Sequence, residues 1–200
     1  MTKTKSQTLM IGEPLGGSMK TYVTSDLHFG HKNIMTFCPQ TRARFKNDVN
    51  YMNNAMVEEW NAKVNPEDTV YILGDVAFMS GSDAGRMINR LNGTKILIEG
   101  NHDRKTLTDA TFRNAFAEVH QYLQVTYDGH RIIMFHYPIA EWDQMHRGAL
   151  HFYGHLHGGV SGLEKYRAFD VGMDATGEIV VSIDYAINRI KNNEIKGHHV

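Results

Sequence analysis

The sequence predicts an α/β fold in which two mixed β-sheets pack face to face with helices outside. Strand and helix patterns alternate from residue 20 to about residue 98, as they do in β-α-β units. The segments 70–73 and 96–98 are apolar runs, which is typical of strands buried on both faces. Asp128-Gly129 separates two later strand patterns and is a strong hairpin signal, so antiparallel strands are expected in the second half.

The first half alternates regularly. We expect, in chain order, a strand at 20–25, helices near 31–38 and 48–63, a strand at 70–73, a helix between Ser82 and Gly93, and a strand at 96–98. The helix at 48–63 is predicted because apolar side chains from Val49 to Trp60 recur at helical spacing. Serine and glycine at the two ends of the next helix are its expected caps.

The second half is rich in predicted strands. We expect a polar helical stretch at 105–116, strands near 119–127, 131–135, 149–153, 167–171 and 178–183, and a closing helix near 184–191. Residues 1–18 end in a run of helix- and strand-breaking residues and are predicted to form a flexible extension. The remaining residues, 19–200, are predicted to form one domain.

Composition and charge argue against several classes of protein. Hydrophobic residues make up 42% of the chain and charged residues 22%, which is ordinary for a globular domain. The formal net charge of −1 provides no basic field for nucleic acid or an anionic membrane. No apolar run approaches the roughly 20 residues that span a bilayer, and the N-terminus lacks the apolar core of a signal peptide. With Cys38 as the single cysteine, a cytoplasmic location is expected, while no feature indicates an oligomeric state.

Residues that bear chemistry stand at five expected strand ends. They are Asp26 and His28, then Asp75, then Asn101, His102 and Asp103, then His136, and finally His155 and His157. Open α/β folds build their sites at the edge where such strand ends meet. Carboxylates, an amide and imidazoles together are ligands for two divalent metals that share a carboxylate. The sequence therefore predicts a binuclear metal hydrolase.

Taken singly, the motifs differ in strength. In an extended chain Asp26 and His28 project to the same side and reach one metal, but most such pairs belong to surface loops. Asp75 alone favours a helix N-cap, and a lone His136 favours a buried structural histidine. The strongest motif is the glycine-bracketed pair of histidines in FYGHLHGG, where the glycines leave room for a substrate.

Together these blocks resemble the calcineurin-like metallophosphoesterase superfamily, in the family's order and over roughly residues 20–185. TSDLHFGHKNI, HYPIAEW and FYGHLHGG are similar to a small single-domain branch from bacteria and phages. VGMDATGEIVVSIDYAI resembles the closing strand and helix of that branch. The resemblance implies a four-layer α/β/β/α sandwich and hydrolysis of a phosphoester.

The resemblance also implies a ligand set and a mechanism. The first metal would be bound by Asp26, His28, Asp75 and His157, and a second by Asp75, Asn101, His136 and His155. Ligands without a thiolate suit two divalent ions, Mn first, with Fe, Zn, Ni or Co as alternatives. A hydroxide bridging the metals would attack phosphorus in line. His102 would stabilise or protonate the leaving oxygen, and Asp103 would either orient His102 or cap the following helix.

One departure from the wider superfamily narrows the activity. After Gly74-Asp75 the chain reads Val76-Ala77-Phe78, without the Asp and Arg that Ser/Thr phosphoprotein phosphatases carry there. A protein phosphatase is therefore disfavoured. By family analogy we expect a phosphodiesterase on small nucleotide-like diesters. The alternatives are a phosphomonoesterase on a nucleotide or metabolite, a nuclease, and a binding module without turnover.

Six more residues are candidates for substrate contact. They are His31, Arg42, Arg104, Trp142, His146 and Arg147. Trp142 would stack a nucleobase, although tryptophan in a loop more often packs on that loop. Arg147 would clamp a second phosphate. Arg42 would contact phosphate, unless it belongs only to a solvated loop. His31 either lines the substrate side or lies in solvent.

Overall fold

The computed structural model describes residues 19–197, so the extension predicted at 1–18 lies outside the described residues. The strands form two sheets. The first contains, in spatial order, β4 (Glu118–His120), β3 (Thr94–Ile98), β2 (Thr69–Ile72), β1 (Thr21–Thr24) and β9 (Val181–Ser182). The second contains β5 (Tyr122–Tyr127), β6 (His130–Phe135), β7 (Leu150–Tyr153) and β8 (Ala168–Asp170).

Both sheets are mixed, which confirms the predicted fold class. In the first sheet β1 to β4 run parallel and β9 pairs antiparallel to β1. In the second sheet β5 and β6 form the hairpin predicted around Asp128-Gly129, and β6, β7 and β8 run parallel. The carboxyl ends of the parallel strands in both sheets are therefore the places where the five motifs begin.

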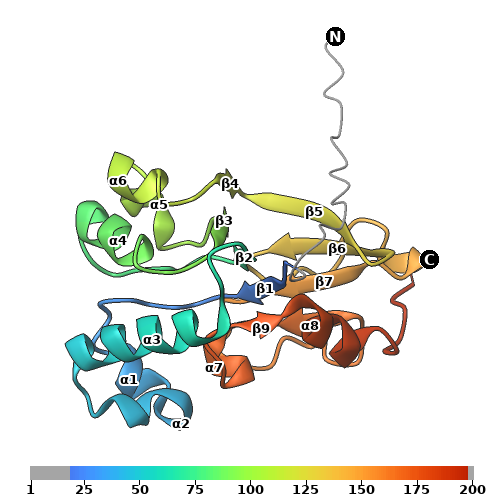
Figure 1. Ribbon diagram of the computed structural model, residues 1–200. Coiled ribbons are helices and arrows are strands. Elements are labelled where there is room, and N and C mark those ends of the chain that lie inside the picture. Colours follow the sequence, from blue (N-terminus) through green and yellow to red (C-terminus); the bar gives the residue numbers. More distant parts are fainter. Residues whose placement is uncertain (1–18, 198–200) are drawn as a thin grey trace.

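Helices lie mainly beside the first sheet, with α1 to α6 on the left of Figure 1 and β5 to β7 on the right. The helices are α1 (Ile34–Phe37), α2 (Pro39–Arg42), η1 (Ala43–Phe45), α3 (Val49–Lys63), α4 (Gly81–Ile88), α5 (Asp103–Thr106), α6 (Ala110–Arg113), η2 (Met145–Arg147), α7 (Met173–Thr176) and α8 (Ile183–Ile190). The predicted helix at 48–63 is α3. The helix predicted between Ser82 and Gly93 is α4, but the expected caps were wrong: Ser80 caps it by accepting a hydrogen bond from the backbone N–H of Asp83, and the helix ends at Ile88. The side chain of Asp48 caps α3 by accepting hydrogen bonds from two backbone N–H groups.

Three predicted elements differ from the structure. The helical stretch at 105–116 is two short helices, because Asp109 caps a new helix by accepting from the backbone N–H of Thr111. The single strand at 119–127 is divided between the sheets, since β4 pairs with β3 and β5 pairs with β6. The strand predicted at 178–183 is the shorter β9. It ends at Ser182 because this residue is the N-cap of α8.

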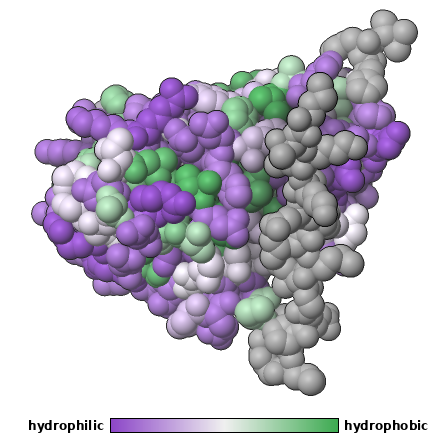
Figure 2. All heavy atoms as spheres, turned by 90° about the horizontal axis from the view of Figure 1, so that it is seen from above, coloured by the Kyte–Doolittle hydropathy of each residue, from purple (hydrophilic) through white to green (hydrophobic). Residues whose placement is uncertain are grey.

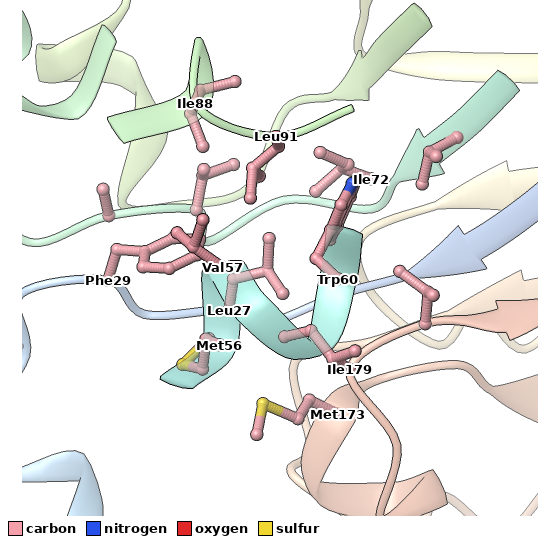
Figure 3. Close-up of a cluster of buried hydrophobic side chains, with 14 of the residues drawn as sticks. Leu27, Phe29, Met56, Val57, Trp60, Ile72, Ile88, Leu91, Met173 and Ile179 are labelled. Carbon is pink, nitrogen blue, oxygen red and sulfur yellow. The ribbon is translucent and has the colours of Figure 1, made fainter. Parts of the chain in front are cut away.

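Each central strand is buried on both faces. Val70 and Ile72 of β2 belong to a cluster under the helices, which includes Trp60 of α3 (Figure 3). Tyr71 and Leu73 belong to a second cluster between the sheets. This period of two explains the continuous apolar run seen in the sequence.

The outer face of the second sheet is covered by the segments 139–149, which contains the short helix η2, and 156–166. Ile133 and Tyr153 from the sheet pack there against Trp142 and Met145. His151 is buried in the same layer, where its Nε2 accepts a hydrogen bond from the backbone N–H of Ile139 at 3.2 Å. Its Nδ1–H then donates to the carbonyl of Ile133 at 3.2 Å. This neutral imidazole ties the segment 139–149 to the sheet.

His151 should make the fold less stable in acid. Burial lowers the pKa of this imidazole to about 4, against 6.5 for an exposed one. As the pH falls below 6.5, the unfolded chain binds a proton that the folded chain excludes, so the free energy of unfolding falls until the pH reaches about 4. The loss amounts to about 3 kcal/mol. In urea denaturation from pH 7.5 to 4, His151→Gln should lose less stability than the wild type by that amount, and parallel pH profiles would contradict this expectation.

Hydrophilic side chains cover most of the face seen in Figure 2, and hydrophobic groups show between them in the half where α4, α5 and α6 lie. Within residues 19–197 there is no helix with the length and apolarity needed to cross a bilayer.

Candidate metal centre

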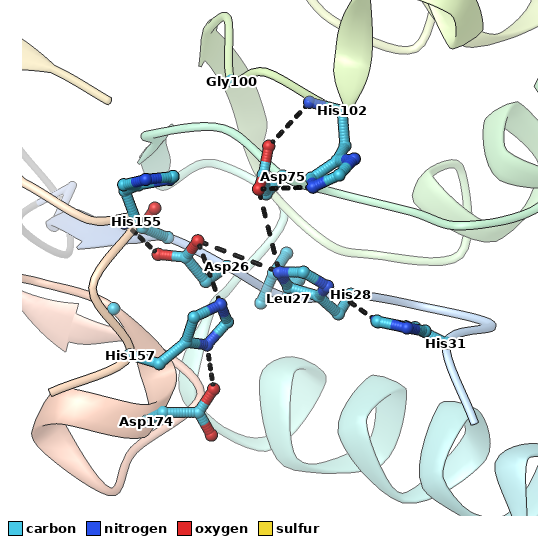
Figure 4. Close-up of polar contacts among 12 residues, drawn as sticks. Asp26, Leu27, His28, His31, Asp75, Gly100, His102, His155, His157 and Asp174 are labelled. Atoms are coloured by element: carbon cyan, nitrogen blue, oxygen red, sulfur yellow. Dashed lines mark hydrogen bonds and ion pairs between the residues drawn. The ribbon is translucent and has the colours of Figure 1, made fainter. Parts of the chain in front are cut away.

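The five strand-end motifs meet at one edge of the two sheets. Asp26 and His28 follow β1, Asp75 follows β2, and the histidine pair follows β7 (Figure 4). The backbone N–H of Asp26 donates to the carbonyl of Gly74 at 3.0 Å, and that of His28 donates to the carbonyl of Asp75 at 3.1 Å. These bonds hold the first two motifs against each other.

An unusual backbone conformation turns the side chains inward. Positive φ angles occur at five residues of the expected ligand set: Asp26 (57°), His28 (53°), Asp75 (54°), His155 (71°) and His157 (50°). The expected extended geometry of the Asp-x-His motif is therefore wrong, although its two side chains do meet. Non-glycine residues in left-handed conformations are uncommon and concentrate at functional sites.

The first group of side chains consists of Asp26, His28 and His157, whose nearest ligand atoms lie within 4.8 Å of one another. Asp26 Oδ1 is 3.8 Å from His28 Nε2 and 3.9 Å from His157 Nε2. Although burial raises the pKa of Asp26, the neighbouring imidazoles, His28 first, hold it below its usual value. The carboxylate is therefore anionic and faces two imidazole nitrogens.

The second group consists of Asp75, His136 and His155, again within 4.8 Å. Asp75 Oδ1 lies 3.6 Å from His136 Nε2, while Asp75 Oδ2 lies 3.9 Å from His28 Nε2 in the first group. Asn101 contributes an amide oxygen 2.9 Å from His136 Nε2. The two oxygens of one carboxylate thus face the two groups.

The donor atoms fit divalent cations. Asp26 Oδ1 and His28 Nε2 are buried and have no hydrogen-bond partner within the described residues. Their separation of 3.8 Å is too long for a hydrogen bond and suits two ligands, each at about 2.1 Å from one ion. His136 Nδ1–H donates to the carbonyl of Leu73, which leaves Nε2 as an acceptor facing the acceptor oxygen of Asn101. A cation bound by both atoms would remove their repulsion.

His31 contacts His28, an expected metal ligand, on the ring nitrogen opposite its metal-facing Nε2. Its Nδ1 lies 3.1 Å from His28 Nδ1, and the ring of Phe78 stacks on both imidazoles with centroid distances of 4.1 and 4.9 Å. Burial and the nearby imidazoles of His28 and His102 lower the pKa of His31 to about 4. A neutral His31 accepts the Nδ1–H of His28 and leaves His28 Nε2 free to bind a metal. His31 is half-buried, so the contact with substrate expected for it stays a prediction beside this supporting role.

Arg42 was expected to contact phosphate, but it is fully buried. Its Nη1 donates to the carbonyl of Leu27 at 2.9 Å and its Nη2 to that of Asp26 at 2.6 Å. Nε also donates to Asp174 at 2.8 Å. Every face of the guanidinium is engaged in holding the Asp26–His28 turn, so it is not available to a phosphate.

Asp174 in turn orients His157. Its carboxylate accepts from His157 Nδ1 at 2.7 Å and from the Thr41 hydroxyl at 2.6 Å. Burial raises the pKa of Asp174, but the hydrogen bonds from His157 and Arg42 outweigh it and hold the pKa well below its usual range. This permanent anion fixes the tautomer that leaves Nε2 of His157 as an acceptor facing Asp26, where it could bind a metal ion.

Replacing Asp174 should weaken metal binding. We expect Asp174→Asn to lower Mn²⁺ affinity by about 10- to 100-fold, the usual effect of losing a carboxylate behind a ligand histidine. Free Mn²⁺ measured by electron paramagnetic resonance during a titration reports that affinity. Asp184→Asn is the matched control, because its exposed carboxylate accepts from the Tyr127 hydroxyl on another part of the surface. Equal affinity in both variants would contradict this role.

Asp103 neither contacts the His102 ring nor caps α5 from the N-cap position. Its buried carboxylate accepts three backbone hydrogen bonds, from Asp75 at 2.8 Å, Val76 at 3.0 Å and Gly100 at 2.9 Å. It therefore ties the turns after β2 and β3 together. His102 is 46% exposed in its side chain, and its Nε2 lies 3.9 Å from Asp75 Oδ2.

Close backbone approach at these turns requires glycine at two motif positions. A Cβ on Gly154 would lie 2.0 Å from Ser25 Oγ and 2.5 Å from Asp26 Oδ2. A Cβ on Gly100 would lie 2.4 Å from Asp75 Oδ1. A side chain at either position would displace the carboxylates.

The structure gives the remaining candidates other surroundings. The side chain of Arg104 is 80% exposed and lies 3.4 Å from Glu99. Trp142 is buried and donates its indole N–H to the carbonyl of Ala149 at 2.8 Å, so its ring is not presented to a nucleobase. His146 and Arg147 lie in η2, the former half-buried and the latter exposed.

Two functional residues escaped the sequence reading. Asp174 stands three residues beyond the predicted strand at 167–171, so the same strand-end rule would have found it. Phe78 was not among the expected site residues, but it stacks on His28 and His31 and its ring centroid lies 4.5 Å from that of His102. Its position directly after a metal motif was the available signal.

Comparison with known proteins agrees with the resemblance seen in the sequence motifs. The family model for calcineurin-like phosphoesterases matches residues 19–172. An uncharacterised protein of Methanocaldococcus jannaschii is 27% identical over 185 residues, covering 88% of this chain and 94% of its own. The gene 66 protein of Mycobacterium phage L5 is 29% identical over 192 residues, covering 80% and 89%. A protein of unknown function from Aquifex aeolicus shares the fold with a TM-score of 0.68 at 22% identity, covering 86% of this chain and 100% of that one.

Proposed function

Because the chain belongs to the calcineurin-like phosphoesterases, which are metal-dependent phosphoester hydrolases, we propose that it is a binuclear phosphodiesterase on small nucleotide-like diesters. The observation that carries the binuclear part is the placement of Asp75. One of its oxygens faces the Asp26 group and the other faces the His136 group. A carboxylate shared in this way suits a two-metal centre.

The protein's own residues then have distinct tasks. The first ion would be held by Asp26, His28, His157 and Asp75, and the second by Asp75, Asn101, His136 and His155. Bound divalent ions, with Mn²⁺ as first choice, would supply Lewis-acid activation of the attacking water and of the phosphate oxygens. His102 reaches toward the shared carboxylate with a half-exposed ring, and we assign it the proton for the leaving oxygen.

The engagement of the arginines supports a diester over a monoester. A monoester dianion carries charge on oxygens that an arginine fork would normally clamp. Arg42 is committed to Asp174 and two carbonyls, and Arg104 lies beside Glu99. A diester has a single charge on phosphate and places a second ester arm where such a clamp would sit.

The test is hydrolysis of bis(p-nitrophenyl) phosphate beside p-nitrophenyl phosphate, in excess Mn²⁺ and again with chelator. We expect the diester to be cleaved faster, and chelator to stop the reaction. A faster monoester would make the protein a phosphomonoesterase. Turnover of neither compound, with two equivalents of Mn²⁺ bound, would favour a binding module.

A further inference from the structure

A row of aromatic rings leads away from the second metal group over the second sheet. The ring of Tyr137 lies 4.5 Å from that of His155 and 4.9 Å from that of His136, measured between centroids. Phe135 follows at 5.7 Å from Tyr137, and Tyr122 at 6.2 Å from Phe135. Tyr122, Phe135 and Tyr137, here called the aromatic row, begin in contact with two ligand histidines.

The aromatic row is open to solvent, unlike the core aromatics. Tyr122 is 41% exposed and Tyr137 is 36% exposed, while Phe135 between them is half-buried. The apolar clusters of the two sheets form without these three rings. Exposed aromatic surface that touches a catalytic centre is typical of ligand sites rather than of packing.

The rings are held in fixed places. Tyr122 and Phe135 are direct partners in the β5–β6 hairpin. The segment that carries Tyr137 is pinned two residues on, where the backbone N–H of Ile139 donates to buried His151. A surface that is already ordered loses little entropy when a planar ligand stacks on it.

The charges around the aromatic row fit a neutral ring rather than a polyanion. On β4, the strand of the first sheet that precedes Tyr122 in the chain, His120 lies 2.7 Å from Glu118. Arg131 of β6 lies 3.9 Å from Asp143. Basic and acidic groups alternate here in pairs, without the continuous positive groove that proteins use to track a nucleic-acid strand.

We propose that the aromatic row is a subsite that stacks the nucleobase on one ester arm of a diester whose phosphate lies at the metal centre. This rests on the proposed function. Tyr137, next to His155, is the ring nearest the phosphate and would make the main contact. Tyr122 and Phe135 extend the surface for a larger base or a second ring. The subsite supplies the role that buried Trp142 does not fill.

Two diesters with the same leaving group isolate the contribution of base stacking to kcat/KM. Thymidine 5′-(p-nitrophenyl phosphate) carries a base, and ethyl p-nitrophenyl phosphate does not. The measured quantity is the ratio of their kcat/KM values, in which any effect on the metals or on chemistry cancels. Base–aromatic stacking predicts that Tyr137→Ala lowers this ratio by about 5- to 150-fold. Tyr137→Phe should keep the wild-type ratio, as should the control Tyr185→Ala, which removes a tyrosine that is 45% exposed on α8.

A second readout needs no turnover. Saturation-transfer NMR with thymidine and chelator-treated protein should show contact to the base in the wild type and Tyr137→Phe, and its loss in Tyr137→Ala. An unchanged kinetic ratio overturns the subsite while leaving the diesterase intact. If the wild type cleaves neither diester, the proposed function fails and the NMR result alone decides on the aromatic row. A dimer that dissociates on Tyr122→Ala, with an unchanged ratio, would assign the aromatic row to a second copy and overturn the proposal.

Discussion

Asp75→Asn is expected to lower kcat by about 10³-fold or more, because a metal ion supplies several kcal/mol of transition-state stabilisation. Asparagine keeps the oxygen that accepts the backbone N–H of His102 at 3.0 Å, and it tolerates the left-handed backbone at this position. The loss should therefore come from the bridge and not from the fold. Metal content measured by mass spectrometry should fall from two equivalents toward one.

Asp128→Asn is the matched control for this substitution. Asp128 also has a positive φ, 45°, but it lies in the turn between β5 and β6, away from the metal centre. Both variants should show the circular dichroism and melting behaviour of a folded protein. If Asp75→Asn retains two metals and wild-type turnover, the shared carboxylate does not bridge them.

His102→Ala should lower kcat by about 10²- to 10⁴-fold, the usual contribution of a positioned proton donor. Only the ring is removed, since the backbone N–H that donates to Asp75 stays in place. The deficit should be large for a diester with a poor leaving group and small for p-nitrophenol, which departs without a proton. Metal content should remain at two equivalents.

His130→Ala, in the β5–β6 hairpin, controls for the loss of a surface imidazole. A His102 variant that loses metal would make His102 a ligand. An equal deficit for good and poor leaving groups would show that His102 does not protonate the leaving oxygen.

Much of the candidate metal centre was predictable because its residues obey a local rule. Each expected ligand stands just beyond a buried strand, and parallel strands bring their carboxyl ends to one edge. Asp75, Asn101 and His136 meet across the two sheets for this reason. Strand positions were readable from apolar runs, since central strands are buried on both faces.

The roles of the supporting residues were not predictable from local pattern. Arg42 looks like any loop arginine, and only the folded chain, with Asp174 far along the sequence, shows that it is buried. Trp142 was a candidate for stacking, and its burial follows from the cover over the second sheet. Asp103 accepts hydrogen bonds from backbone N–H groups of two turns. Every residue except proline offers such an N–H group, so the sequence does not show which ones Asp103 contacts.

The boundaries that failed also depend on distant partners. The chain leaves the first sheet after β4 and enters the second at β5 within a single strand-like stretch. Only pairing with β3 on one side and β6 on the other shows the division. Continuous β-propensity therefore predicted one strand where the fold uses two.

The positive φ angles at Asp26, His28, Asp75, His155 and His157 have a consequence for protein engineering. A designer who grafts these five side chains onto an ideal scaffold will not recreate the centre, because ideal strands and helices avoid left-handed residues. The turns must be transferred whole, together with the partners that hold them, such as Arg42 and Asp103. Whether this candidate metal centre can be moved to another protein therefore depends on its main-chain conformation.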